Sequence, residues 1–424
     1  MTLPPPEKTS IVLPVIAQVP AAWTFGALVG GLLGGLLIAF SAPGALPVVD
    51  TWILPVGEMW LQALQATIVP LVAALLFTGV IQTVATASAG LLARRSLGLF
   101  LAFLAFSAAM ALAVTPALIA LIPIPAGAGE ALRDTLSSKD AGPVPGVAAF
   151  LRSIVPTNVL DAAANDRMLP LILFVAVFAL AVSRLAGPQR DVMVTFFAAL
   201  ASAMLVVIGW VLALAPFGVF ALSLAVAARS GTSVIGALAH YILIVVLTGS
   251  VVLIAGYGVA TLGARKRLGA FARAMLPVQA FALSTQSSLA SLPVMLGACR
   301  DLEVKETTSE FVMPLAVALF RATSPAMNLA VAIYVAHLYG VQIPPLMMAA
   351  GWLVAILVSL SSVSLPGSIS FVASVGPIAI AMGVPVEPLA LLVAVEVLPD
   401  LMRTLGNVTL DVAVTAAVDR GVEA

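Results

Sequence analysis

Six polar residues near the C-terminus have the spacing of one face of a helix. At about 100° per residue they fall within an arc of about 100°, and apolar side chains occupy the other directions. The six are Glu396, Asp400, Arg403, Thr404, Asn407 and Asp411. A guanidinium such as that of Arg403 can bind a carboxylate through two parallel hydrogen bonds, whereas Asp400 could accept an ammonium group and Asp411 a cation. We therefore interpret this polar face as a candidate binding site for a small anionic solute.

The chain around this polar face has the composition of a membrane protein. Of the 424 residues, 62% are hydrophobic and 9% are charged, whereas soluble domains contain about 25% charged residues. Each charge buried in a bilayer costs at least about 2.5 kcal/mol, so four ionisable groups on one helix need a reason. They could bind a solute, or they could pair with each other, as Asp400 with Arg403, and only hold the bundle together. Three carboxylates beside one arginine leave negative charge unbalanced, which favours solute binding.

Several classes of function are not expected. The net charge is zero and no basic run is present, so we expect no nucleic-acid partner. Cys299 is the only cysteine, which excludes a disulfide or a cysteine-based metal site within one chain. The common hydrolase, zinc-protease and P-loop motifs are absent, so we expect neither an enzyme nor a cofactor. His240 and His337 lie near the ends of apolar segments and are predicted to be structural.

Membrane-spanning helices must position the polar face, because stretches of about 20 apolar residues occur almost from end to end. Breaks at glycine, proline and charged clusters predict helices near residues 22–40, 51–87, 96–123, 150–184, 191–229 and 235–263. The N-terminal tail has no typical cleavage site, so we expect it to be retained. Most lysines and arginines fall on the cytoplasmic side if the N-terminus does. We therefore expect a multi-pass protein of the cell (inner) membrane with cytoplasmic N- and C-termini.

Two apolar segments, residues 270–298 and 346–383, are interrupted in the middle by QSSLASLP and SLSSVSLPGSIS. Each is better explained by two half-length helices than by one span, although spans with packing kinks are the alternative. Irregular backbone at membrane depth is tolerated only inside protein or along a cavity. Paired broken segments indicate a transporter binding site.

Six motifs in order resemble the dicarboxylate/amino acid:cation symporter family, which includes the glutamate and aspartate transporters. The motifs are MWLQALQATIVPLVAALLFTGV (59–80), IVPTN (154–158), APFGVFAL (215–222), QSSLASLPV (286–294), SLPGS (364–368) and DLMRTLGNVTLD (400–411). The resemblance covers nearly the whole chain. It implies an all-α polytopic membrane protein, with eight transmembrane helices, two re-entrant helical hairpins and inverted repeats, that forms a homotrimer and works as an elevator-type transporter. The scaffold would comprise mainly helices 1, 2, 4 and 5 (about 22–87 and 150–229). The transport core would comprise mainly helices 3, 6, 7 and 8 and the hairpins (about 96–123 and 235–418).

The resemblance also implies roles for individual residues. Arg403 would bind the side-chain carboxylate of an acidic substrate, Asp400 its amino group and Asn407 its main-chain carboxylate. The second hairpin, around Pro366 and Gly367, would act as the extracellular gate. The remaining substrate contacts would be Thr404, Ser287, Ser288, Ser324 and Gly367. The expected function is symport of an acidic amino acid or a C4-dicarboxylate with a cation. Asp400 favours an amino acid.

The sequence departs from the family in the seventh helix, where an Asn-Met-Asp-Gly-Thr signature supplies sodium ligands. Aligned through VMPL (312–315), these positions are Phe320, Arg321, Ala322, Thr323 and Ser324. The helix 3 ligands fall in LGLFLAFLAF (97–106), which has no polar side chain. We therefore expect the sodium site shared by helices 3 and 7 to be absent and sodium coupling to be weakened.

Other residues could still bind a coupling ion. The expected cation-binding or proton-carrying residues are Asp411, Asn407, Glu396, Ser359 and Ser362. A proton could replace sodium, because burial disfavours the charged form of a carboxylate such as Glu396 or Asp411. Arg321 either supplies a fixed positive charge to Asp411 or Asp400, or extends into a cytoplasmic crevice. The alternative function is a transporter-like ligand sensor or an uncoupled exchanger of another small solute.

Overall fold

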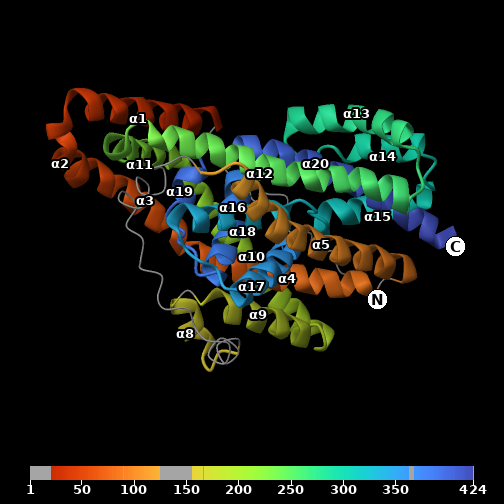
Figure 1. The fold of residues 1–424 in the computed structure, drawn as a ribbon. Helices are drawn as coiled ribbons and strands as arrows, with labels where there is room; N and C mark the ends of the chain where they lie inside the picture. The colour runs from red at the N-terminus through yellow and green to blue at the C-terminus, as the bar shows by residue number, and fades with distance from the viewer. Residues whose placement is uncertain (1–20, 89, 125–154, 166, 362–366, 424) are drawn as a thin grey trace.

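The computed structural model describes residues 21–88, 90–124, 155–165, 167–361 and 367–423 (Figure 1). Within these ranges every regular element is a helix, so the predicted all-helical class is confirmed for this part of the chain. In the described part of the chain, six helical stretches are long and apolar enough to cross a membrane. They are Trp23–Ser41, Pro43–Ala87, Leu91–Leu121, Gly187–Ala213, Val234–Gly263 and Glu306–Tyr339.

The first helices form a bent pair at one end of the molecule (red in Figure 1). Helix α1 (Ala21–Ser41) packs along α11 (Ala215–Ser230), and the approach is close because α1 is rich in glycine. A Cβ atom on Gly35 would lie 2.4 Å from the carbonyl oxygen of Leu224, and small residues permit such contacts between membrane helices. The predicted helix near 51–87 starts earlier and bends at Thr67. Its parts are η1 (Pro43–Ala45), α2 (Leu46–Val48), η2 (Val49–Ile53), α3 (Leu54–Ala66) and α4 (Ile68–Ala87).

The next part of the chain corrects two predicted helices. Residues 150–154 lie outside the described residues, and the rest of the predicted helix near 150–184 is two helices, α8 (Val159–Ala164) and α9 (Met168–Val182). The single helix predicted near 191–229 is wrong. It is divided at Leu214 into α10 (Gly187–Ala213) and α11. Pro216 lies in the first turn of α11, where its missing backbone N–H leaves no helical hydrogen bond unmade. Helix α5 (Leu91–Leu121) is continuous through Pro116.

Both interrupted segments are pairs of helices. The first is α13 (Leu268–Thr285) and α14 (Leu292–Asp301), joined through Gln286, whose φ of 51° ends α13 in a left-handed conformation. The second is α17 (Pro345–Ser361) and α18 (Gly367–Ala381), which pack against each other. The residues between α17 and α18, including Ser362 and Pro366, lie outside the described residues.

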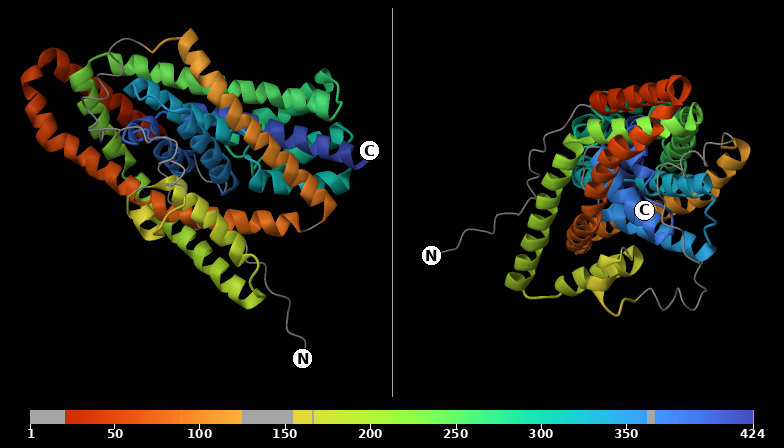
Figure 2. Two further views of the ribbon diagram at one scale, coloured as in Figure 1. Left: turned by 60° about the horizontal axis from the view of Figure 1, so that its bottom comes forward. Right: turned by 90° about the vertical axis from the view of Figure 1, so that its left-hand side faces the viewer.

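The last helix, α20 (Val397–Glu423), lies against α12 (Ser233–Gly258), which continues as η3 (Val259–Gly263). Figures 1 and 2 show the two helices running alongside each other toward the C-terminus. Helix α20 also packs on α5, α13, α14 and α15 (Glu306–Leu319). Next to it, α16 (Ser324–Tyr339) is buried along almost its whole length. The short α19 (Leu389–Leu392) precedes α20. This packing encloses the polar face of α20 in protein.

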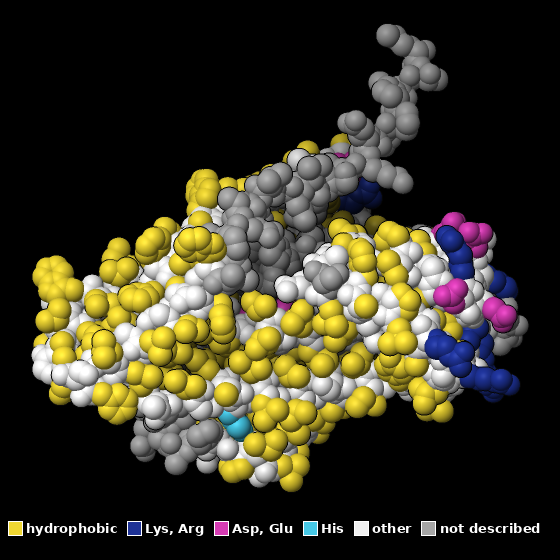
Figure 3. Space-filling model, turned by 90° about the horizontal axis from the view of Figure 1, so that it is seen from above, with side chains coloured by type: hydrophobic (Ala, Val, Ile, Leu, Met, Phe, Trp, Pro, Cys, Tyr) yellow, Lys and Arg dark blue, Asp and Glu magenta, His cyan; other side chains and the backbone are white. Residues whose placement is uncertain are grey.

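The surface divides into apolar and charged parts. Figure 3 shows apolar side chains over most of the face drawn, with charged side chains gathered at the end that holds α13, α14 and the C-terminal part of α20. The exposed charged residues of this end include Arg265, Arg267, Arg300, Asp301 and Glu303. An apolar belt with a charged end is the surface that a membrane protein requires.

Candidate functional site

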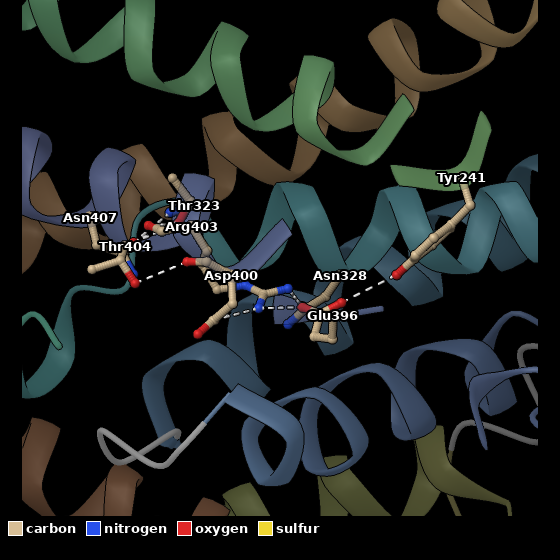
Figure 4. Close-up of polar contacts among 8 residues, drawn as sticks. All are labelled: Tyr241, Thr323, Asn328, Glu396, Asp400, Arg403, Thr404 and Asn407. Carbon is tan, nitrogen blue, oxygen red and sulfur yellow. Dashed lines mark hydrogen bonds and ion pairs between the residues drawn. The ribbon is translucent and has the colours of Figure 1, made fainter. Parts of the chain in front are cut away.

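The polar face of α20 is buried beside the break between α15 and α16. Glu396, Arg403, Thr404, Asn407 and Asp411 are each at most 5% exposed. The side chain of Asp400 is 13% exposed. Figure 4 shows the polar residues in a line that runs from Asn407 and Thr404 at one end to Tyr241 at the other. Glu396 precedes the first residue of α20, so the predicted stripe is helical from Asp400 onward and Glu396 joins it from the preceding turn.

Arg403 is the centre of the site. Its Nη1 donates to Glu396 Oε1 at 2.6 Å and to Asp400 Oδ1 at 2.9 Å. Its Nη2 donates to Asn328 Oδ1 at 3.3 Å. No described residue accepts a hydrogen bond from Nε of Arg403. The pairing of Asp400 with Arg403 that the sequence left open is therefore present, and among the described residues it leaves Nε of the guanidinium without an acceptor.

Asn407 and Thr323 tie α20 to the break between α15 and α16. The backbone N–H of Thr323 donates to Asn407 Oδ1 at 3.0 Å. The Thr323 hydroxyl lies 2.7 Å from the same oxygen and 2.9 Å from the carbonyl oxygen of Arg403. A Cβ atom on Gly406 would lie 2.2 Å from Thr323 Cγ2. Helix α20 therefore needs glycine where the break rests on it.

The break persists although the glycine of the family signature is replaced. Phe320 ends α15 with φ −105° and ψ 80°, and α16 begins at Ser324 with Pro325 in its first turn. The hydroxyl of Ser107 on α5 donates to the carbonyl oxygen of Ala322 at 2.6 Å. Hydrogen bonds from two neighbouring helices thus satisfy backbone groups that a continuous helix would have paired.

An aromatic cluster occupies the region where α5 faces this break. The ring of Phe320 stacks on Phe100 with centroids 4.7 Å apart, and Phe103 meets Phe320 edge-on at 5.9 Å. Phe100 and Phe320 are almost fully buried. This cluster supplies no oxygen ligand for a hard cation such as sodium.

Arg321, the residue after Phe320, interacts electrostatically with the buried Asp411. Asp411 is 1% exposed, and neither of its oxygens has a hydrogen-bond partner among the described residues. The charged group that acts on Asp411 is the half-buried Arg321, which also interacts electrostatically with Asp400 and Arg403. The guanidinium of Arg321 thus lies within electrostatic range of both aspartates.

The remaining predicted site residues lie in other elements. Ser287 and Ser288 are in the loop between α13 and α14, where Ser287 Oγ accepts from the N–H of Ala290 at 3.2 Å. Ser324 is the buried first residue of α16, and Gly367 is the first residue of α18. Ser359 is buried in α17 and donates to the carbonyl oxygen of Ala355 at 2.7 Å. In the described part of the chain, no hydrogen bond joins these residues to Arg403.

Thr404 lies on the polar face, and its hydroxyl donates to the carbonyl oxygen of Asp400 at 2.9 Å. Sequence reasoning missed two residues of the network, Tyr241 on α12 and Asn328 on α16. The Tyr241 hydroxyl donates to Glu396 Oε2 at 3.3 Å. Both are polar residues within long apolar segments, and this was the sequence signal that could have identified them as site residues.

The arrangement can bind ionic groups without a transition metal. Among the described residues no three His, Cys, Asp or Glu side chains are grouped as a metal site requires. The buried guanidinium of Arg403 can donate to a carboxylate, and Asp400, the most exposed acid of the network, can accept from an ammonium group. The arrangement thus offers partners for both charged groups of a small zwitterion or dianion.

The chain is similar to several known transport proteins. The chain is 25% identical over 393 residues to the proton/sodium-glutamate symport protein of Geobacillus stearothermophilus, covering 89% of each chain. It is 29% identical over 268 residues to the proton/glutamate-aspartate symporter of Escherichia coli strain K12, covering 62% of this chain and 60% of the relative. It is 24% identical over 387 residues to a C4-dicarboxylate transport protein of Rhizobium etli, covering 88% and 84%.

The match to the family as a whole is wider than any of these alignments. The pattern described as the sodium:dicarboxylate symporter family matches residues 21–421, which include the broken segments, the helix break at Phe320 and all of the polar face of α20. The chain therefore belongs to the sodium:dicarboxylate symporter family, whose members are membrane transporters and not enzymes.

Proposed function

We propose that this chain is a secondary active transporter that moves an acidic amino acid or a C4-dicarboxylate across the membrane together with a cation. The observation that carries the proposal is Arg403, a guanidinium buried at the break between α15 and α16 whose Nε donates to no acceptor among the described residues. The relatives named above are symporters of glutamate or aspartate and a transport protein for C4-dicarboxylates.

Substrate binding is assigned to the polar face and the two broken segments. Arg403 binds the side-chain carboxylate, Asp400 the amino group and Asn407 the main-chain carboxylate. The supporting contacts are assigned to Thr404, Ser287, Ser288, Ser324 and Gly367. The exposure of Asp400, greater than that of its neighbours, supports its role toward a substrate group. Asn407 already accepts from Thr323, so its amide N–H groups are the ones offered to substrate.

The coupling ion is assigned from the residues around the break between α15 and α16. Phe100, Phe103 and Phe320 fill the region where α5 meets the break, which supports loss of the sodium site shared by helices 3 and 7 and weakened sodium coupling. Arg321 then acts as a fixed cation toward Asp411 and Asp400. A proton on Glu396 or Asp411 replaces sodium as the driving ion, and the other residues offered to a cation are Asn407, Ser359 and Ser362.

The larger architecture is proposed from the family. It comprises eight spanning helices with re-entrant hairpins at α13–α14 and α17–α18, the latter acting as extracellular gate. The scaffold is about 22–87 and 150–229, and the moving core is about 96–123 and 235–418. The charged end at α13, α14 and the C-terminal part of α20 supports a cytoplasmic location for the C-terminus. The N-terminus is assigned to the same side of the cell (inner) membrane from the distribution of basic residues in the sequence. A homotrimer with elevator-like movement completes the proposal.

An uncoupled exchanger is the second candidate function. The interaction of Arg321 with Asp400 and Asp411 favours it, because a resident guanidinium could neutralise the site without any coupling ion. A ligand sensor would bind substrate but show no counterflow.

The test is uptake by purified protein reconstituted in liposomes. Aspartate, glutamate, succinate, fumarate and neutral amino acids are screened while sodium and pH gradients are varied separately. We expect uptake of an acidic solute that follows the pH gradient without sodium. Uptake that depends on sodium alone would contradict the assigned coupling, exchange without response to either gradient would favour the exchanger, and no transport of any acidic solute would overturn the proposal.

A further inference from the structure

Arg403, the residue assigned to the substrate's carboxylate, already holds a carboxylate of the protein. Glu396 Oε1 lies 2.6 Å from Arg403 Nη1, which is closer than Asp400 on the same nitrogen. Glu396 and Arg403 are 1% and 2% exposed. The contact therefore lies fully inside the protein, where a charge-assisted hydrogen bond is little weakened by solvent.

The position of Glu396 is fixed by a second contact, which comes from α12. Its other oxygen, Oε2, accepts from the hydroxyl of Tyr241 on α12 at 3.3 Å. The Tyr241 ring is fully buried and meets Tyr334 edge-on with centroids 5.4 Å apart. The Tyr334 hydroxyl in turn donates to the carbonyl oxygen of Ala237 at 3.0 Å and takes no described part in the Glu396 network. Glu396 is thus held between Arg403 on one oxygen and Tyr241 on the other (Figure 4).

The charge balance around Arg403 makes this contact relevant to substrate. One guanidinium faces two carboxylates, those of Glu396 and Asp400, so the group of three carries a net negative charge when both acids are ionised. A substrate carboxylate that binds Arg403 would be the third carboxylate beside this guanidinium. Like charges this close repel strongly in a buried site, and Glu396 is also the same chemical group as the substrate's second carboxylate.

We propose that Glu396 is an internal competitor for the second carboxylate of the substrate, and that Tyr241 is the positioning residue that holds it on Arg403. This inference rests on the proposed function and deepens it. Glu396 and Tyr241 set how strongly the protein prefers an acidic substrate over the neutral amide of the same shape. The negative charge of Glu396 repels the carboxylate of the substrate. When a substrate carboxylate with better hydrogen-bond geometry binds Nη1 of Arg403, it displaces Glu396 from that atom.

The test compares affinities for aspartate and asparagine, which differ only in the side-chain group that faces Arg403. Binding is measured by competition against labelled substrate on purified protein whose folded state is checked by size-exclusion chromatography. For Glu396→Gln we expect aspartate affinity to rise about tenfold, because one negative charge beside Arg403 is removed. Asparagine affinity should stay within about twofold. A merely structural role would move both affinities alike.

Tyrosine variants test the positioning role with a matched control. Tyr241→Phe should also raise aspartate affinity, by about threefold, because Glu396 loses the hydrogen bond from the Tyr241 hydroxyl and keeps the one from Arg403. Tyr334→Phe removes a hydroxyl from the neighbouring buried ring and should leave the ratio of the two affinities unchanged.

The outcomes separate this inference from the function on which it rests. Wild-type protein that binds neither aspartate nor succinate would overturn both. Wild-type binding, with aspartate affinity lowered or within twofold of wild type in both Glu396→Gln and Tyr241→Phe, would overturn the inference and leave the proposed function standing.

Discussion

Replacing Arg321 with methionine tests whether its guanidinium acts as a built-in cation. The change keeps an apolar stem and removes the positive charge that acts on Asp411. Asp411 is 1% exposed and has no hydrogen-bond partner among the described residues. Losing the charge that compensates a buried carboxylate costs up to about 3–5 kcal/mol. Arg321 is only half-buried, so we expect the lower end of that range in sodium-free buffer.

The assay is thermal unfolding of the purified protein in detergent, with and without sodium, alongside uptake in liposomes. In Arg321→Met we expect lower stability that sodium or acid partly restores, because a bound cation stabilises the folded state by mass action. Uptake should acquire a dependence on sodium that the wild type lacks. Adding Asp411→Asn to Arg321→Met should recover most of the lost stability, since the uncompensated charge is gone.

Arg273→Met provides the matched control. Arg273 is an exposed arginine on α13, so its loss should change stability by less than about 0.5 kcal/mol. If Arg321→Met left stability, uptake and cation dependence all as in the wild type, the built-in cation would be refuted and Arg321 would be a residue that merely extends into a crevice.

Three further predictions follow from the packing and the site. Gly406→Ala should lower the free energy of unfolding by about 1–3 kcal/mol, because its Cβ would meet Thr323 at 2.2 Å; thermal unfolding checks this against Gly421→Ala, which has open space on the same helix, and equal effects would contradict it. Cys299 is fully buried, so maleimide should label it slowly in folded protein and rapidly after unfolding; equally fast labelling would show that the α13–α14 packing is wrong. Arg403→Lys keeps the charge but loses the planar fork, so affinity for acidic substrate should fall by about 10-fold or more; equilibrium binding measures it, and wild-type affinity would contradict the role of the fork.

Much of the fold could be predicted from composition and breaks. The apolar runs identified the helices that bear the site, and QSSLAS marked the end of α13 correctly because Gln286 closes that helix in a left-handed conformation. The boundary at Leu214 was missed because the residues on either side are uniformly apolar and give no periodic signal. Pro216 was the available sign of a new helix.

The residues of the polar face were predicted from the sequence, whereas the residues of other helices that contact them were not. Periodicity brought Arg403, Asn407 and Asp411 to one side of α20, and the structure agrees. Tyr241 and Asn328 join this face from helices 155 and 75 residues away from their partners. Single-helix periodicity cannot identify such contacts, because they depend on how helices pack. Nor could the sequence show that the break at Phe320 survives without glycine, because Ser107 and Asn407 support it from other helices.

The central claim, that Arg403 and its surroundings form the site of an acidic-solute transporter, is tested most directly by counterflow. Liposomes holding purified protein are loaded with unlabelled aspartate or succinate, and entry of the labelled solute is followed with no ion gradient. The account predicts transient accumulation of the labelled solute by the wild type and its loss in Arg403→Ala. Accumulation of a neutral solute alone, or full counterflow in Arg403→Ala, would contradict it.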